Sequence, residues 1–221
     1  MGTAFDHALE LRELGAAAEA YASGHGKPGT AAYRAAWLRY RAETRAPDAQ
    51  PSWQPPPWSL NRDCVRLLNL ALKRAMLIDG APMANAQIVD GEHKALRIVA
   101  HAGLNSEFLE FFQVVDHGSR ASCGDALAMN RSLWVEDTIG SPIFAGSLAL
   151  EVLLDAGSRR CSSVPVRSPS GQVIAMINTH HNRTACWNDR QKLGLEVLAS
   201  TTGKLLHALM RDARSGPNDT P

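Results

Sequence analysis

The chain has 221 residues, 45% of them hydrophobic and 20% charged, which allows one folded domain with a real core plus an appendage. A formal net charge of +1 gives no basic field that would attract nucleic acid or an anionic membrane surface. No apolar stretch reaches the roughly 18 residues of a membrane helix and no secretory signal is visible, so we expect a cytoplasmic protein without nucleic-acid or membrane partners.

Two helices are predicted in the first part of the chain. Residues 3–22 are rich in Ala and Leu, and the second helix, after a glycine-rich turn, has aromatic residues spaced i, i+4, i+7 on one face. The consecutive prolines Pro55–Pro57 exclude a helix or a central strand after it. We therefore expect a helical N-terminal extension over residues 1–46 and a proline-rich linker over residues 47–58.

From Ser59 the pattern becomes that of a mixed domain. Leucines at helical spacing predict a helix that ends near Asp79–Gly80, because glycine commonly ends helices. Runs of strand-forming residues separated by turn sequences predict two hairpins. The expected strands are 84–89 with 96–100 and 163–167 with 173–179, and a short helix is expected over 107–112.

A final helix is predicted from Asp189 to Arg211, followed by a flexible tail over residues 212–221. Asn188 and Gln191 have the spacing of a capping box at its start. The helix carries an apolar stripe made of Leu195, Leu198, Leu205 and Leu209. The order helix, hairpin, irregular middle, hairpin, long helix predicts an α+β fold, in which helices pack on an antiparallel sheet.

Short segments within residues 59–211 also follow the pattern of a known family. These segments are Ala84–Asp90, Leu96–Leu104, Ser122–Leu127, Leu133–Asp137, Ser163–Val166 and Gly171–Ile177. Their order and spacing resemble the GAF domain family. The resemblance implies a central antiparallel sheet with the first and last helices on one face and a cavity on the other. Family members use that cavity for cyclic nucleotides, tetrapyrroles, haem or small metabolites, or keep it only for packing, so the fold does not fix the ligand.

The resemblance also implies which residues line the cavity. We expect Cys123, Leu127, Trp134, Asp137, Phe144 and Leu150 from the middle of the domain, and His180 from the last strand. This middle part combines large apolar groups with few charges, as small-molecule pockets do, and Asp137 is the expected polar anchor. In the alternative interpretation, Trp134 and Phe144 are core residues and Asp137 only caps a turn.

The adjacent His180 and His181 do not predict a metal site. Adjacent side chains on a strand point to opposite faces, so the two rings cannot bind one ion, and the sequence does not tell which of them faces the cavity. In many phytochrome-type GAF domains the chromophore thiol is followed by a histidine, and no cysteine of this chain is followed by one. We therefore expect no metal, no covalent bilin and no other cofactor, with haem on a single histidine as the alternative.

Cys123–Gly124 also resembles free methionine-(R)-sulfoxide reductases, which are GAF proteins with a cysteine before a glycine at this point. A position at a helix start would lower the pKa of the Cys123 thiol and favour the thiolate. The resemblance places the resolving thiols near Gln113 and Ser147, which are not cysteines, and Cys161 comes later. A thiol without a resolving partner cannot readily complete a disulfide turnover, so we expect no enzyme.

These observations predict a sensory module that binds an unidentified small molecule non-covalently. It would signal through a homodimer, which the apolar stripe of the last helix favours, or through a signalling protein in trans. One alternative is an interaction or dimerisation module whose cavity is filled by side chains. The other is a thiol reductase of the methionine-sulfoxide kind.

Overall fold

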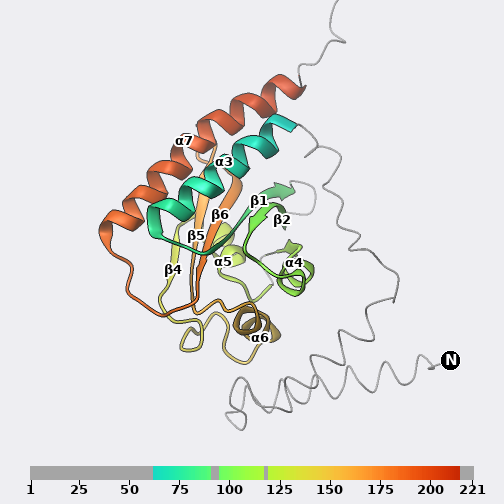
Figure 1. Ribbon diagram of the computed structural model, residues 1–221. Helices are drawn as coiled ribbons and strands as arrows, with labels where there is room; N and C mark the ends of the chain where they lie inside the picture. Colours follow the sequence, from blue (N-terminus) through green and yellow to red (C-terminus); the bar gives the residue numbers. More distant parts are fainter. Residues whose placement is uncertain (1–61, 91–94, 117–118, 215–221) are drawn as a thin grey trace, which may run out of the picture.

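The computed structural model describes residues 62–90, 95–116 and 119–214 (Figure 1). The predicted N-terminal extension and the proline-rich linker lie outside these residues, as do residues 215–221 of the predicted tail. Of the helices in the described part of the chain, none combines the length and hydrophobicity needed to cross a bilayer.

An antiparallel sheet of six strands forms the middle of the domain, in the order β3-β2-β1-β6-β5-β4. Both hairpins predicted from the sequence are present, as β1–β2 and β5–β6, and β1 pairs with β6 at the centre. The strands are β1 Met83–Asp90, β2 Ala95–Ala102, β3 Val114–Val115, β4 Leu133–Val135, β5 Arg160–Arg167 and β6 Val173–His181. The two central strands therefore come from opposite ends of the described chain.

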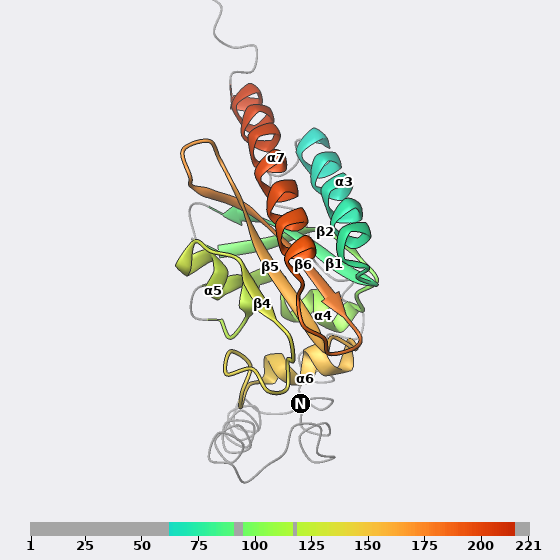
Figure 2. The same cartoon turned by 90° about the vertical axis from the view of Figure 1, so that its left-hand side faces the viewer.

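Helices α3 (Arg62–Asp79) and α7 (Asp189–Arg214) lie side by side on one face of the sheet, which we call the outer face (Figures 1 and 2). They pack on small and branched side chains of the strands. The buried residues of this layer include Leu68, Leu72, Ala84, Ala86, Ile177, Leu195 and Leu206. The predicted first and last helices of the domain are thus confirmed, on the same face.

The ends of these two helices follow the sequence signals. Gly80 has φ +75, a left-handed conformation that ends α3 at little steric cost. At the start of α7, Gln191 N donates to Asn188 Oδ1 at 2.9 Å and Asn188 N donates to Gln191 Oε1 at 3.3 Å. The predicted capping box is therefore confirmed.

The predicted apolar stripe of α7 lies mostly against the sheet. Leu195 is buried in the outer-face core, and Leu198 and Leu209 pack against that core. Only Leu205 is exposed. A contact surface between two copies would therefore use other residues of this helix.

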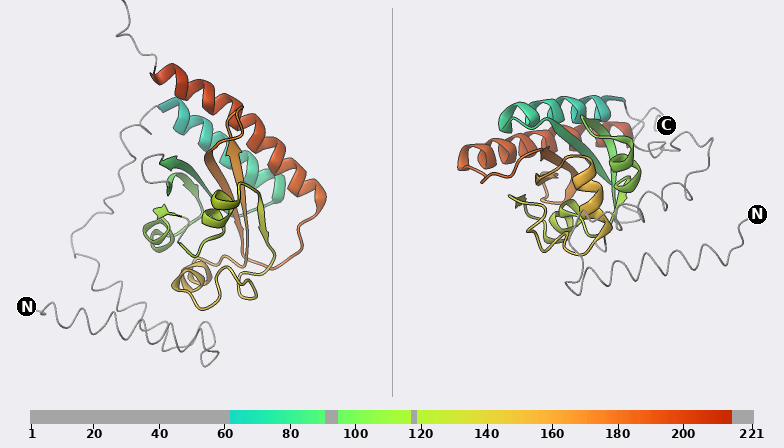
Figure 3. Two further views of the ribbon diagram at one scale, coloured as in Figure 1. Left: turned by 180° about the vertical axis from the view of Figure 1, so that it is seen from behind. Right: turned by 60° about the horizontal axis from the view of Figure 1, so that its bottom comes forward.

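Three helices cover the opposite face of the sheet, which we call the inner face (Figures 2 and 3). They are α4 (Ser106–Phe111), α5 (Ser122–Met129) and α6 (Leu148–Asp155). Their apolar side chains form a second core with the strands, including Leu96, Phe108, Cys123, Phe144, Leu150 and Met176. The sequence predicted α4 and the start of α5, but α6 was taken as irregular chain.

Candidate functional site

Polar side chains occupy the inner face of the two central strands. On β1, Asn85 and Gln87 alternate with residues of the outer-face core, and on β6, Asn178 and His180 do the same. All four are buried; the exposed fraction is 0% for Gln87, 2% for Asn178 and 5% for His180. A polar group placed so deep costs free energy unless it is hydrogen-bonded, so each of their bonds must be accounted for.

The side chain of Asn178 joins those of Asn85 and Gln87 in a network of three amides. Asn85 and Asn178 face each other in the β1–β6 register. Asn178 Nδ2 donates to Asn85 Oδ1 and, at 2.9 Å, to Gln87 Oε1. Both hydrogens of the Asn178 amide are therefore used inside this network.

Three atoms of the inner face have no hydrogen-bond partner within the described residues: Gln87 Nε2, Asn178 Oδ1 and His180 Nε2. Native proteins leave few buried polar groups unpaired, and such groups commonly mark the place of a water, an ion or a ligand. These three belong to neighbouring side chains on two paired strands. They form the strongest indication of a binding site in the described structure.

His180 is held in a largely apolar setting. Its Nδ1 lies 3.0 Å from Ser158 Oγ, and its ring meets the Phe108 ring edge-on at 5.0 Å. Burial, with the neighbouring His181 as a lesser cause, lowers the pKa of His180 to about 3. The imidazole is therefore neutral at neutral pH and offers Nε2 as an uncharged hydrogen-bonding atom.

The inner face also holds two buried thiols, Cys123 on α5 and Cys161 on β5. Ser122 Oγ lies 3.6 Å from Cys161 Sγ and 2.9 Å from Ser163 Oγ. Burial raises the pKa of each thiol to about 12, although the nearby Gln87 side chain partly offsets this for Cys123. The expectation that a helix start lowers the pKa of Cys123 is wrong, because desolvation is the larger effect.

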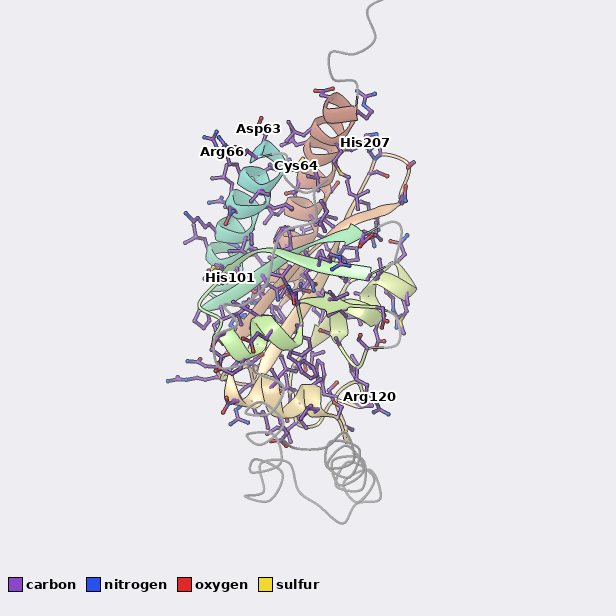
Figure 4. The ribbon with its side chains drawn as sticks, turned by 90° about the vertical axis from the view of Figure 1, so that its right-hand side faces the viewer. Asp63, Cys64, Arg66, His101, Arg120 and His207 are labelled. Atoms are coloured by element: carbon purple, nitrogen blue, oxygen red, sulfur yellow. The ribbon has the colours of Figure 1, made fainter. Side chains whose placement is uncertain are left out.

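A surface pocket of about 210 Å³ lies at the edge of the same core. Its walls are the end of α4, β3, Ser119–Arg120 and the first residues of α6. Arg120 stands beside α6 in Figure 4, and its Nη1 donates to Ala145 O at 2.8 Å. None of Gln87, Asn178 and His180 is among the residues that line this pocket.

The wall of the pocket contacts α5 directly. A Cβ atom at Gly124 would lie 3.3 Å from Val115 Cγ1, a pocket residue, and 2.6 Å from Asp116 O. Glycine is therefore needed where α5 approaches this segment so closely. Cys123 precedes Gly124, and its thiol is the neighbour of the Gln87 side chain.

Most of the predicted site residues come together on the inner face. Cys123, Phe144 and Leu150 belong to one core cluster, Leu127 packs against it, and His180 lies beside Phe108 of that cluster. A ligand-binding role for these residues stays a prediction.

Trp134 and Asp137 are placed elsewhere. Trp134 packs with the outer-face core, where its ring lies 5.3 Å from that of Trp187. Asp137 is exposed, and its Oδ1 accepts a hydrogen bond from Ile139 N at 2.9 Å within its own turn. The core and turn-capping roles of the alternative interpretation describe these two positions.

His181 faces the outer side, so the prediction that the two histidines diverge is confirmed. Its Nε2 lies 3.2 Å from Asp79 Oδ2, which also accepts a hydrogen bond from Thr179 Oγ1 at 2.6 Å. Arg160 Nη2 approaches the His181 ring at 3.0 Å, and its guanidinium lies 4.2 Å from the Trp187 ring centroid. This buried cluster attaches the end of β6 to the end of α3.

The three amides were not predicted from the sequence. Asn85 and Gln87 alternate with Ala84 and Ala86, and such alternation is typical of a strand with one solvated face. Here helices cover both faces, so the polar residues are buried. A sequence signal does exist, because amides occur at i and i+2 on one strand and Asn178 lies on the strand that pairs with it.

Comparisons with known proteins agree with this architecture. The family model described as GAF domain matches residues 61–207. A search of curated proteins gave no match.

Several solved structures share the fold. The PixJ GAF domain of Thermosynechococcus elongatus, in its blue-light absorbing form, is 18% identical at a TM-score of 0.57, over 74% of this chain and 98% of that one. Free methionine-R-sulfoxide reductase from Neisseria meningitidis, in complex with its substrate, is 21% identical at a TM-score of 0.54. This match covers 71% of the present chain and 84% of the reductase chain. The GAF domain of an Acinetobacter phosphoenolpyruvate-protein phosphotransferase is 11% identical at a TM-score of 0.54. This match covers 74% of the present chain and 91% of that domain.

At these identities the likeness to solved structures concerns the fold alone, and the neighbours include GAF domains of signalling proteins and an enzyme. The family itself follows from the sequence match, which covers most of the described residues and spans both hairpins and both helices of the outer face. This chain belongs to the GAF domain family.

Proposed function

We propose that this chain is a sensory module that binds a small molecule non-covalently on the inner face of its sheet. The bound molecule would change how α3 and α7 associate with a second copy or with a signalling protein. A thiol reductase is no part of the proposal, because burial raises the pKa of the Cys123 and Cys161 thiols to about 12 and disfavours the thiolate that such an enzyme needs.

The three unpaired atoms of Gln87, Asn178 and His180 carry this proposal. A domain that used its inner face only for packing would be more stable with apolar side chains at these positions. Ligand binding would explain why polar side chains occupy these positions, because a ligand that supplies the missing hydrogen bonds removes the free-energy cost of burying the three atoms.

The arrangement of β6 supports a route from the ligand to the helices. His180 faces the inner site, and the next residue, His181, contacts Asp79 at the end of α3. Gln191 in the first turn of α7 donates to the Asp79 carbonyl oxygen at 3.2 Å. A shift of the end of β6 on ligand binding would therefore reach both helices of the outer face.

Native mass spectrometry of the chain purified from its own host tests the proposal. We expect a retained small molecule, seen as a discrete mass increment that disappears on denaturation. The Gln87→Met variant should lose the increment, because it removes one hydrogen-bonding group at similar volume. The matched control is Asn69→Met, which replaces an amide on α3 that bonds only within its helix in the described structure.

Folding of both variants is checked by circular dichroism and thermal unfolding. If the folded wild-type chain carries no increment from its host and takes up none from a host extract, the proposal is wrong. The chain would then be an interaction module with a filled core.

A further inference from the structure

The surface pocket beside α6 is separate from the inner-face site of the proposed function, since the residues of that site do not line it. Its volume is about 210 Å³. An apolar protein cavity of roughly 150 Å³ is large enough to hold benzene. The pocket therefore has room for one ring with a short substituent.

Apolar side chains form most of the pocket wall. Phe111 and Phe112, where α4 ends, contribute two aromatic rings that meet edge-on with their centroids 4.8 Å apart. The other apolar residues of the wall are Val114, Val115, Leu148 and Ala149. Aromatic rings favour edge-on or offset contacts with one another. The wall therefore suits a flat apolar group, and an aromatic ring in particular.

The two serines of the wall use their hydroxyl groups inside the protein. Ser147 Oγ donates to Phe144 O at 2.6 Å. Ser119 Oγ donates to Asp116 Oδ1 at 2.9 Å and accepts from Asp116 N at 3.2 Å. Neither hydroxyl hydrogen is left for a ligand, so the pocket lacks the set of hydrogen-bonding side chains that a sugar or another polyol needs.

Arg120 is the only charged residue among the described residues that line the pocket. Its exposed side chain stands beside α6 (Figure 4), where Nη1 donates to Ala145 O at 2.8 Å. It forms no ion pair with a carboxylate in the described part of the chain. Most of its N–H donors therefore remain for a ligand, and a guanidinium matches a carboxylate with two parallel N–H···O bonds.

The surroundings of Arg120 favour an anionic ligand. The acidic residues of the neighbouring segments, Asp116 and Glu151, do not line the pocket, and Asp116 Oδ1 accepts a hydrogen bond from Ser119 N at 2.8 Å. The bond to Ala145 O already holds the Arg120 side chain, so a ligand loses little entropy by ordering it. A carboxylate would therefore meet a positioned cation next to an apolar wall.

We infer that this pocket binds a small aromatic monocarboxylate, with its ring against Phe111 and Phe112 and its carboxylate on the Arg120 guanidinium. The inference does not depend on the inner-face site. It adds a second binding site to the domain and names an anionic ligand class for it.

Titration of the ¹⁵N-labelled full chain with three probes, followed by two-dimensional NMR, tests the inference. Phenylacetate has the ring and the carboxylate, phenylacetamide has the ring without the charge, and acetate has the charge without the ring. We expect phenylacetate to bind at least about tenfold more tightly than either of the others, because each lacks one of the two contacts. The largest shifts of amide signals should belong to Arg120, Leu148 and Ala149.

Variants localise the binding. Arg120→Gln should weaken phenylacetate binding at least about tenfold and remove the preference over phenylacetamide. Val114→Glu should also weaken it, because it adds a negative charge to the wall at an exposed position. Arg131→Gln is the matched control, since Arg131 is an exposed arginine that does not line the pocket, and binding should be unchanged. Circular dichroism and thermal unfolding check that each variant folds.

The comparison of probes uses the wild-type chain, so it gives a result even if a variant does not fold. Binding of phenylacetamide as tightly as phenylacetate, or signal shifts confined to residues outside the pocket, would overturn the inference. Absence of phenylacetate binding at millimolar concentration would overturn it as well, including the case in which another segment of the chain fills the pocket. None of these outcomes affects the inner-face proposal, because its residues do not line this pocket.

Discussion

The His180 imidazole makes the inner face sensitive to acid. Burial lowers the pKa of His180 from 6.5 to about 3. Between these values the unfolded chain binds a proton that the folded chain does not, so stability is full above about pH 6.5 and falls as the pH drops towards 3. The loss reaches at most about 1.4 kcal/mol per pH unit for one such group.

We therefore predict that His180→Gln weakens the dependence of stability on pH between 6 and 4, measured by urea unfolding at a series of pH values. His101→Gln is the matched control, because His101 is exposed on β2. Equal slopes for the wild-type chain and the His180→Gln variant would contradict the prediction.

The four thiols differ sharply in access. Cys64, Cys123 and Cys161 are buried, and Cys186 is exposed. We predict that iodoacetamide at pH 8 modifies Cys186 quickly in the folded chain and all four cysteines after denaturation, as measured by mass spectrometry of the alkylated protein. Rapid modification of Cys123 in the folded chain would show a reactive thiol there and return the reductase alternative to consideration.

Close backbone packing fixes α7 on the sheet. A Cβ at Gly203 would lie 1.9 Å from Arg167 O, so an alanine there forces the helix away from β5. At Gly194 the nearest atom, 2.8 Å away, is the Ile78 methyl Cγ2, the end of a side chain that can move. The two glycines therefore differ in what an alanine would displace.

We predict that Gly203→Ala lowers the free energy of unfolding by about 3 kcal/mol or more, because backbone atoms must shift. Gly194→Ala should stay within about 1 kcal/mol of the wild-type chain, because the gain in helix propensity offsets the small displacement. Urea unfolding of both variants measures the difference. Similar losses at the two positions would mean that α7 is not held as described.

At the scale of elements, the sequence predicted the ends of the outer helices but not the residues of the amide network. Gly80 and the Asn188–Gln191 pair act within a few residues, so the sequence alone shows where α3 ends and α7 begins. Helix α6 was not predicted because Ala149–Leu153 is buried on all sides and shows no helical period. The amide network was not predicted because it forms only when β1 pairs with β6, which lies almost a hundred residues away.

The whole molecule leaves apolar side chains exposed on its outer helices. Leu193 and Val197 are four residues apart on α7 with exposed fractions of 64% and 56%, and Leu77 on α3 is 75% exposed. Gly194 faces Ile78, so Leu77 and Leu193 lie at the same end of the helix pair. An apolar surface of this kind on two helices is typical of an interface.

We predict that the chain is a homodimer at tens of micromolar and that Val197→Lys converts it to a monomer, measured by light scattering after size exclusion. Glu196→Lys is the control, since it changes the charge of the exposed neighbouring residue without removing an apolar side chain. A wild-type chain that is monomeric under these conditions would contradict the prediction.

Occupation of the inner face is decided most directly by a crystal structure of the chain purified from its own host. We predict electron density for a small molecule against β1 and β6, with hydrogen-bonding atoms within about 3.2 Å of Gln87 Nε2 and Asn178 Oδ1. The molecule should contact the apolar core next to Cys123. Density for a single water, or for side chains that close completely over these atoms, would contradict a ligand-binding role for this face.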